Sequence, residues 1–551
     1  MSSIYDMFNI GKLGIMAQQN AMQVTAHNIA NVYTEGYSRQ EVVFTETTPV
    51  GGVGTGVDIS EIRRKHDNFV ERQITDGKES YGNYFALNSA YTKIEGLFYN
   101  SQGNGIDIQL NEYFKSWQDL SANPSGTAER ITVISKADIL ADSINNAHAN
   151  MIQLQKDMNN EISQTVNEIN DIASQIAVLN EKISQIEAGG QNANDYRDMR
   201  GKLLNDLAEK IDIQFYEDNT GQITVMAGGV ATLVDNNSSW DLEVESNPDN
   251  SGYYNIMYSP DGSTSLDLTD RISGGQINGL LTIRDSVTVD VIDKLDRFAA
   301  SLANEMNQLH RSGYALDGST GLNFFTPAFE AGDSVSSPAL SSNAGTGNVG
   351  VVIADPSQLT FQNYEVTFSG GNYTITNTSA DTVVTGAYTD PDTVTFEGLT
   401  FTISGNHADG DTFNVSAHKD AAKNLQVAID DNDFDMIAAA SGTDGIAGDN
   451  RNALSIAQLQ DQLSIDGTSS FGTYYGTIVG EIGVSSQSSG NFLDIQKYSL
   501  DQLSNIRESV SGVSLDEEMT NLIKYQSAYD ASAKLISIAD ELLQTLIGLV
   551  K

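Results

Sequence analysis

The feature that most constrains the fold of this chain is an uninterrupted helical pattern at its C-terminus. Residues 515–551 contain no proline, and Gly548 is their only glycine. Ser514 and Glu517 have the spacing of a capping box, which favours a helix start at this point. At 1.5 Å per residue, the segment predicts a rod of about 54 Å.

Apolar residues recur along this rod at spacings of three, four and seven. Such a narrow seam favours a partner helix, although the same spacing also fits a long helix that lies on its own domain. Gln526 and Asp540 occupy two positions that would complete the heptads, and buried polar residues can fix the register of a seam. The predicted seam consists of Leu515, Met519, Leu522, Tyr529, Ala533, Ile536, Leu543, Ile547 and Val550.

The N-terminus predicts a second amphipathic helix, over about residues 4–30. One stripe contains Ile10, Leu13, Ala17 and Val24, at helical spacing. Residues 31–36 are mostly polar and end in a glycine, so they predict the stop of this helix.

The middle of the chain alternates between helical and strand patterns. Helices are expected near 138–187, 196–211 and 277–309, and again after Lys419, while alternating strands are expected in 212–270 and 347–416. Gly370-Gly371 predicts a hairpin turn between two such strands. The fold class predicted is α+β and multi-domain. The expected division is a terminal helical core (1–50 with 512–551), a helical middle domain (51–211, 276–346 and 417–511), a β-rich insert (212–275) and an inserted β domain (347–416).

Composition excludes several classes of function. Asp and Glu number 73 against 30 Lys and Arg, which gives a formal net charge of −43 and makes nucleic-acid binding improbable. The chain has no cysteine, which removes disulfides, thiol catalysis and thiolate metal sites. The N-terminus has no Sec-type signal, and no apolar run is long enough to span a membrane.

A search for catalytic or ligand-binding motifs finds none that requires an enzyme. The six histidines form no metal-ligand spacing. Gly52, Gly54 and Gly56 superficially resemble a dinucleotide-binding loop, but Val57 stands where that loop needs its third glycine, so they predict a turn into a strand. The acidic run 430–435 lacks the glycine and the closing glutamate of a calcium loop. We therefore expect no catalytic residues, no cofactor and no metal.

Residues that follow the first helix carry a resemblance to a known family. Asn28-Ile29-Ala30-Asn31, Thr34 and Gly36-Tyr37-Ser38-Arg39-Gln40 resemble the N-terminal signature of flagellar rod, hook and hook-associated proteins. His27 and Glu35 depart from the usual Asn and Pro of that signature. The Ser-Arg-Gln continuation favours the first hook-associated branch of the family. Asn28, Asn31, Gly36 and Tyr37 are taken as the family motif.

The resemblance extends through most of the chain. Matching blocks include 279–285, 307–325 and 448–460, and the ending from Gly512 to Leu543 resembles the family's C-terminal signature. The block 347–416 matches least sharply.

The resemblance implies a structural protein at the junction between hook and filament, outside the cell. It implies that the terminal helices pair as a coiled coil and self-assemble in a helical oligomer. The implied partners are further copies, hook protein, the next junction protein and an export chaperone that holds the C-terminal helix during type III export.

Two alternatives remain at this stage. One is another flagellar axial protein, such as hook, distal rod or third hook-associated protein. The other is a secreted adhesin or glycosidase built on the β blocks, although Trp117 and Trp240, the only tryptophans, lie in different segments.

Overall fold

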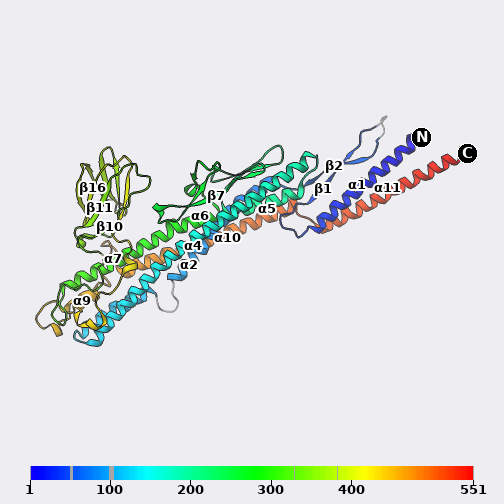
Figure 1. Cartoon of the computed structure of the whole chain (residues 1–551). Coiled ribbons are helices and arrows are strands. Elements are labelled where there is room, and N and C mark those ends of the chain that lie inside the picture. The colour runs from blue at the N-terminus through cyan, green and yellow to red at the C-terminus, as the bar shows by residue number, and fades with distance from the viewer. Residues whose placement is uncertain (1, 50–53, 99–104, 328, 381, 550–551) are drawn as a thin grey trace.

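The chain forms an elongated molecule with both termini at one end (Figure 1). The computed structural model describes residues 2–49, 54–98, 105–327, 329–380 and 382–549. Helix α1 (Ser2–Ala30) and helix α11 (Leu515–Leu549) lie side by side at the terminal end. A long helical body follows, and β-sheets lie against it, so the predicted α+β, multi-domain class is confirmed.

The body is built around one very long helix, α4. In the sequence, apolar residues recur at helical spacing from Ile144 to Ile183, and they form part of the buried face of this helix. The helix begins at Thr127, well before the predicted start at 138. The body helices are α2 (Asn68–Phe98), α3 (Ile106–Ala122), α4 (Thr127–Ala188), α5 (Asn194–Lys210), α6 (Gly275–Thr282), α7 (Thr288–Ser312), α9 (Arg451–Gln458) and α10 (Phe471–Ser511), with a single turn, α8 (Ala421–Asn424).

Two predicted helical regions are less regular than a continuous helix. The predicted helix 277–309 is interrupted by a π-helical turn, Ile283–Val287, where the fully buried Arg284 bonds to Asp285 and to Asn159. Helix returns after Lys419 as the single turn α8 and then from Arg451 in α9 and α10, whereas residues 425–450 form loops and short 3₁₀ turns. Distant side chains bond to part of this backbone: Arg130 donates to the carbonyl of Ile437, and the amide of Ala438 donates to His310 Nε2.

Four small sheets and a ribbon complete the fold. β1 (Gln40–Glu46) and β2 (Val57–Arg64) form an antiparallel ribbon beside α1. Against α4 lie a sheet of β3 (Ile213–Glu217), β4 (Ile223–Ala227), β5 (Ala231–Asp235) and β6 (Ser238–Ser239), and a sheet of β7 (Leu242–Ser246), β8 (Tyr254–Tyr258) and β9 (Leu266–Asp267).

The β domain stands out from the body (Figure 1). Its two sheets have the orders β10-β11-β16-β15 and β14-β13-β12-β17. Alternate residues are buried, as in β11 and β12, which is the pattern of a sheet with one covered face. The hairpin at Gly370-Gly371 is confirmed, with Ser369 opposite Asn372. The strands are β10 (Ser334–Val335), β11 (Asn348–Ile353), β12 (Asn363–Ser369), β13 (Asn372–Asn377), β14 (Val383–Ala387), β15 (Asp392–Phe396), β16 (Leu399–Ser404) and β17 (Thr412–Ser416).

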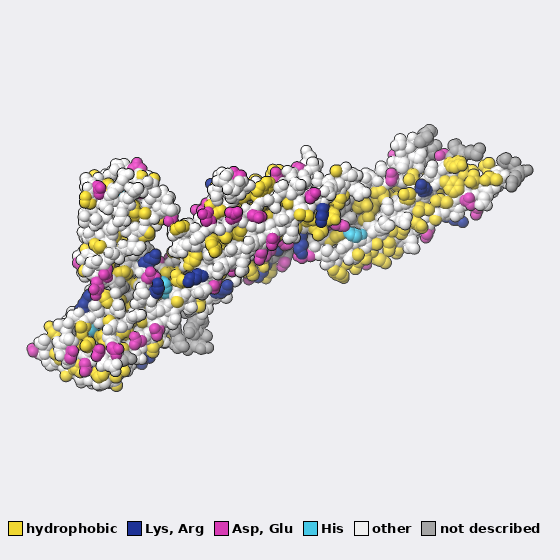
Figure 2. Space-filling view, in the orientation of Figure 1, with side chains coloured by type: hydrophobic (Ala, Val, Ile, Leu, Met, Phe, Trp, Pro, Cys, Tyr) yellow, Lys and Arg dark blue, Asp and Glu magenta, His cyan; other side chains and the backbone are white. Residues whose placement is uncertain are grey.

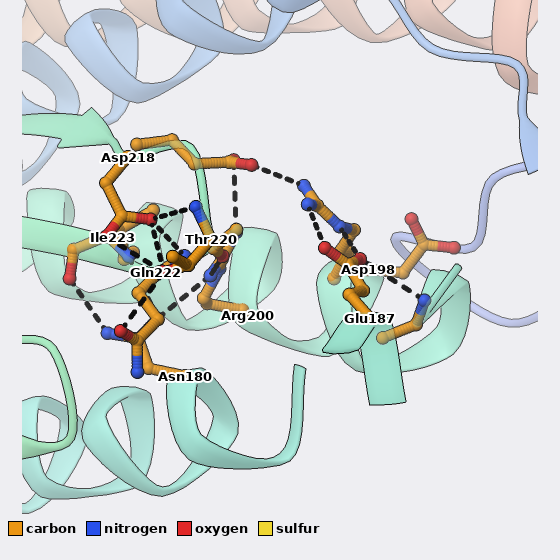
Figure 3. A network of polar contacts seen from close by, with 12 residues as sticks. Asn180, Glu187, Asp198, Arg200, Asp218, Thr220, Gln222 and Ile223 are labelled. Carbon is orange, nitrogen blue, oxygen red and sulfur yellow. Dashed lines mark hydrogen bonds and ion pairs between the residues drawn. The ribbon is translucent and has the colours of Figure 1, made fainter. Parts of the chain in front are cut away.

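A buried polar network fixes the first sheet to the helices (Figure 3). Asn180 of α4 is fully buried, and its side chain bonds to both the amide and the carbonyl of Ile223, at 3.2 and 2.8 Å. Arg200 of α5 donates to Asn180 Oδ1 at 2.8 Å and to Glu217 at 3.2 Å. Burial lowers the pKa of Arg200 to about 10, so its guanidinium stays charged at neutral pH.

We expect Asn180→Ala to destabilise the sheet that contains β4. The substitution leaves the buried peptide groups of Ile223 without their side-chain partner and removes one acceptor of the Arg200 side chain, at a cost of about 2–3 kcal/mol. Hydrogen exchange of the β4 amides measures this as faster local opening. Asn160→Ala, at an exposed position of the same helix, is the matched control. Equal exchange in the two variants would contradict the anchoring role.

Candidate assembly interface

Helices α1 and α11 approach each other closely along a row of small residues. The face of α1 that is buried consists of Gly11, Gly14, Ala17, Ala21, Thr25 and Asn28. A Cβ added at Gly11 would lie 2.6 Å from Ile536 Cγ1, and one at Gly14 would lie 2.7 Å from Ser532 Oγ. Both distances are below ordinary contact. A side chain at Gly11 would require Ile536 to shift, and one at Gly14 would require the Ser532 hydroxyl to rotate away. Close packing therefore favours glycine at both positions, despite its cost of about 1 kcal/mol in a helix.

The large apolar residues predicted for α1 flank this row. Ala17 is buried, at 2% exposure, whereas Ile10, Leu13 and Val24 are half-buried. Ile10 and Leu13 lie against Gly56, at the start of β2. Of the predicted stripe, Ala17 belongs to the buried row, and the role of Ile10, Leu13 and Val24 in a coiled-coil seam stays a prediction.

On α11 one of the two predicted heptad rows is largely covered, and the covered positions of the other row lie one residue earlier in the sequence than predicted. Leu522, Tyr529, Ala533, Ile536 and Leu543 are half-buried, as part of a seam would be. The covered positions that complete it are Glu518, Tyr525 and Ala539, in place of Met519, Gln526 and Asp540, and Ser532 is half-buried beside Ala533. Gln526 and Asp540 are exposed, so the idea that they set register in the buried seam is wrong within one chain. Val550 lies outside the described residues.

Three predicted seam residues have no cover within the chain. Leu515, Met519 and Ile547 are 41%, 49% and 55% exposed. Their role in contacts between copies stays a prediction, as does the role of the other predicted seam residues in assembly.

The family motif forms a buried polar junction where α1 ends. The Asn28 side chain donates to the carbonyl of Gln40 at 2.9 Å, and it accepts from the Gln40 amide at 2.9 Å and from the Tyr37 hydroxyl at 2.8 Å. It also donates to Glu518 Oε2 of α11 at 3.2 Å. The Asn28 amide group therefore donates two hydrogen bonds and accepts two, which is its full capacity. These bonds connect α1, the following loop and α11.

Arg39 completes the junction. Its Nε lies 2.7 Å from Glu518 Oε1, and its Nη1 lies 2.6 Å from Glu517 Oε2. Burial lowers the pKa of Arg39, but the Glu517 hydrogen bond and the charge of Glu518 outweigh it, so the pKa is raised overall. The Glu518 side chain is only 2% exposed, and that of Glu517 is 62% exposed, so the two adjacent carboxylates differ sharply in burial.

The junction also fixes the terminal helices to the body. The Arg39 amide donates to the carbonyl of Ser511 at 2.8 Å, and Arg507 of α10 donates to the carbonyl of Gly36 at 2.8 Å. Gly36 has a φ of +80°, which glycine adopts readily. The Ser38 amide bonds to Asp198 of α5 at 2.8 Å.

Two motif residues shape the loop itself. Asn31 caps the end of α1 by donating to the carbonyl of His27 at 3.0 Å, and Thr34 donates to its Oδ1. Burial, with the charge of Asp195, raises the pKa of the Tyr37 hydroxyl, which therefore remains a donor. All four motif residues thus lie at one junction, within or beside the end of α1.

Sequence patterns missed three residues that fix how α1 and α11 pair, namely Gly11, Gly14 and Glu518. Gly11 and Gly14 interrupt the apolar stripe, so its spacing gives them no role, and Glu518 is one of three acidic residues in the first turn of α11. The sequence signal that could have indicated the role of Glu518 is Arg39 in the N-terminal signature block together with the adjacent glutamates of the C-terminal one. Among the described residues, no cluster of His, Asp and Glu gathers as metal ligands would, and no helix is long and apolar enough to cross a membrane.

Comparison with known families agrees with this architecture. The family model of the flagellar hook-associated protein FlgK helical domain matches residues 91–325, and that of the flagellar hook-associated protein 1 D2-like domain matches 339–417. The flagella basal body rod protein model matches 8–37, over α1 and the junction loop. The flagellar basal body rod FlgEFG protein C-terminal model matches 508–549, over α11.

Relatives extend over the whole chain. Flagellar hook-associated protein 1 of Escherichia coli (strain K12) is 27% identical over 560 residues, covering 100% of each chain. That of Bacillus subtilis (strain 168) is 25% identical, covering 100% of this chain and 99% of its own. The solved flagellar hook junction protein FlgK from Burkholderia pseudomallei shares the fold, with a TM-score of 0.69, 20% identity and coverage of 80% of this chain and 100% of that one.

The paired terminal helices, matched at both ends by rod-protein models, place the chain among the axial proteins of the bacterial flagellum. Within that class, the chain belongs to the flagellar hook-associated protein 1 family. The full-length relatives favour this family over the hook, distal rod, third hook-associated and adhesin alternatives.

We expect Glu518→Ala to loosen α11 from α1 much more than Glu517→Ala does. Removing the buried carboxylate takes one partner from Arg39 and one from Asn28 at a buried site, which costs about 3 kcal/mol. Removing the exposed one costs less than about 1 kcal/mol. Hydrogen exchange of the α11 amides measures both losses. If the two variants exchange alike, the buried junction does not hold the helices together.

Proposed function

We propose that this chain joins the hook to the filament as a structural subunit, by packing its terminal helix pair against those of neighbouring copies at the distal end of the hook. Its membership of the flagellar hook-associated protein 1 family supports a flagellar location and a structural role. The observation that carries the proposal is the apolar face that the α1–α11 pair leaves uncovered.

The uncovered apolar residues lie towards the two ends of α11. They recur every four residues from Leu515 to Ile523 and again from Ile538 to Leu546. Figure 2 shows hydrophobic side chains gathered over the terminal helix pair. The exposed large apolar residues are Leu515, Met519, Ile523, Ile538, Leu542, Leu546 and Ile547 of α11, with Tyr5 and Met16 of α1.

An exposed face of this kind needs a partner. Soluble monomers rarely leave a long contiguous apolar surface in water, and a lone pair of helices is a weak structure without further packing. The net charge of −43 repels like copies at a distance, so contact must come from apolar burial. A ring or helix of copies would cover the face of each α11 with its neighbour.

The remaining partners follow from the same surface. Hook protein and the next junction protein would contact the two sides of the assembled layer. An export chaperone that holds α11 would cover the same apolar face before assembly, during export through the flagellar type III apparatus. We expect no catalytic activity, because the described chain uses its buried polar groups to fix helices and sheets.

The first test adds the purified protein to isolated hooks that lack their junction proteins, followed by electron microscopy. We expect binding confined to the distal hook ends. Binding along the hook, or no binding by a folded protein, would contradict the proposal.

The second test removes the uncovered face. We expect Ile523→Ser with Leu542→Ser to reduce occupied hook ends by at least about tenfold, because each buried side chain contributes about 1.5–3 kcal/mol and 1.4 kcal/mol is a factor of ten. Both residues are exposed, at 60% and 46%, so the monomer should keep its helical circular dichroism. Lys534→Ser, exposed on the same helix, is the control and should bind normally. Normal binding by the double variant would sink the role of this face.

A further inference from the structure

The body carries an uncharged surface in an otherwise highly charged chain. Residues 80–92 of α2 and 482–493 of α10 contain no Asp, Glu, Lys or Arg. The two stretches lie side by side: the rings of Tyr84 and Phe492 stack with centroids 5.1 Å apart, and Asn88 Nδ2 lies 3.5 Å from Ser489 Oγ. They therefore form one continuous surface along the flank of the body.

Large side chains stand exposed on this surface. Phe85 is 48% exposed and Phe492 45%, and just beyond them Ile495 is 56% and Tyr498 75% exposed. Tyr81 stacks on Phe85 at 6.0 Å. We call Tyr81, Tyr84, Phe85, Phe492, Ile495 and Tyr498 the aromatic flank. Exposed aromatic residues gathered in this way, with few charges, are the composition of a protein–protein contact.

The aromatic flank continues into the uncovered face of the terminal helices. Along α10 the exposed apolar residues run on through Ile506 and Val510, at 42% and 41% exposure. The next are Leu515 and Met519 at the start of α11, at 41% and 49%. A neighbouring molecule that packs against α11 could therefore also contact the exposed apolar residues of α10.

We propose that the aromatic flank is a contact surface for a second copy of this chain. The inference rests on the proposed function, because the neighbour on α11 is taken to be another copy. Two chains that each carry −43 meet with least repulsion and least loss of hydration where neither presents a charge. Two ion pairs at the edge, Asp494 with Lys497 at 3.9 Å and Lys78 with Glu209 at 2.8 Å, are each neutral overall. A second, equally acidic copy is thus the partner that most needs such a surface.

The absence of cysteine allows a direct test. Tyr498→Cys and, as a control, Val178→Cys on α4 each introduce a single thiol at an exposed position; Val178 is 48% exposed. Each protein is labelled with benzophenone maleimide, bound to isolated hook ends and irradiated. Mass spectrometry then identifies the peptides joined to the label.

We expect the label at position 498 to join a second copy of this chain, at a yield at least about tenfold above that from position 178. A label at 498 that blocks binding to hook ends, while the label at 178 does not, would also support a covered flank. Adducts from 498 to hook protein or another flagellar protein, or none in a bound molecule, would overturn the inference and leave the proposed function standing. Failure of both labelled proteins, and of the unlabelled chain, to bind would overturn the proposed function and the inference with it.

A second variant guards against an effect of the label. Phe492→Ser with Ile495→Ser should keep the circular dichroism of the monomer and its initial binding to hook ends through α11. It should lower the number of copies held per hook end several-fold. An unchanged number of copies would overturn the inference.

Discussion

The contact on which the terminal structure depends is the near approach of two helix backbones at Gly11 and Gly14. A Cβ at Gly11 would lie 2.6 Å from Ile536 Cγ1 and one at Gly14 would lie 2.7 Å from Ser532 Oγ, so α1 and α11 approach most closely where α1 presents its small residues. This fixes how far α11 can slide and rotate. The same register brings Glu518 opposite Asn28 and Arg39, so the apolar contact and the buried polar junction require each other. Once that face of α11 is used, its remaining apolar residues point away from α1 and stay exposed.

Charge is distributed in a way that serves this arrangement. A chain with 73 acidic and 30 basic side chains repels its own copies, yet many of its arginines are used internally, as Arg39, Arg200 and Arg507 show. Arg39 and Arg507 neutralise carboxylates where segments distant in sequence meet, near the ends of α1 and α10, and Arg200 of α5 neutralises Glu217 of β3. The uncovered surfaces of α11 and of the aromatic flank instead carry apolar side chains. The arginines thus join elements of the same chain, and the surfaces proposed to contact other chains carry apolar side chains.

Much of the fold could be predicted from spacing, because long helices and alternating strands carry strong periods. The stripe from Ile144 to Ile183 marked the buried face of α4, and Gly370-Gly371 marked a hairpin, both from local pattern alone. The phase of the α11 seam was harder. Its spacing fitted Met519 and Gln526 as well as Glu518 and Tyr525, and only the small-residue row on α1 decides between them. Glycine weakens a helical pattern, so Gly11 and Gly14 hid the face that mattered most. The irregular segment 425–450 could not be predicted, because part of its backbone bonds to Arg130 and His310, which lie far away in sequence.

The most direct test of the account is a disulfide between the two terminal helices. A Cβ at position 14 would lie 3.4 Å from Ser532 Cβ, close to the separation in a disulfide of about 3.5–4.5 Å, and the chain has no other cysteine. The double variant Gly14→Cys with Ser532→Cys should therefore form an intrachain disulfide on mild oxidation, both free and bound to hook ends. Mass spectrometry would find one molecule lighter by two hydrogens. The control Gly14→Cys with Ser537→Cys, which places the second thiol at an exposed position, should remain largely reduced. Free thiols in both variants, or disulfides only between chains, would contradict the pairing of α1 with α11 in this register.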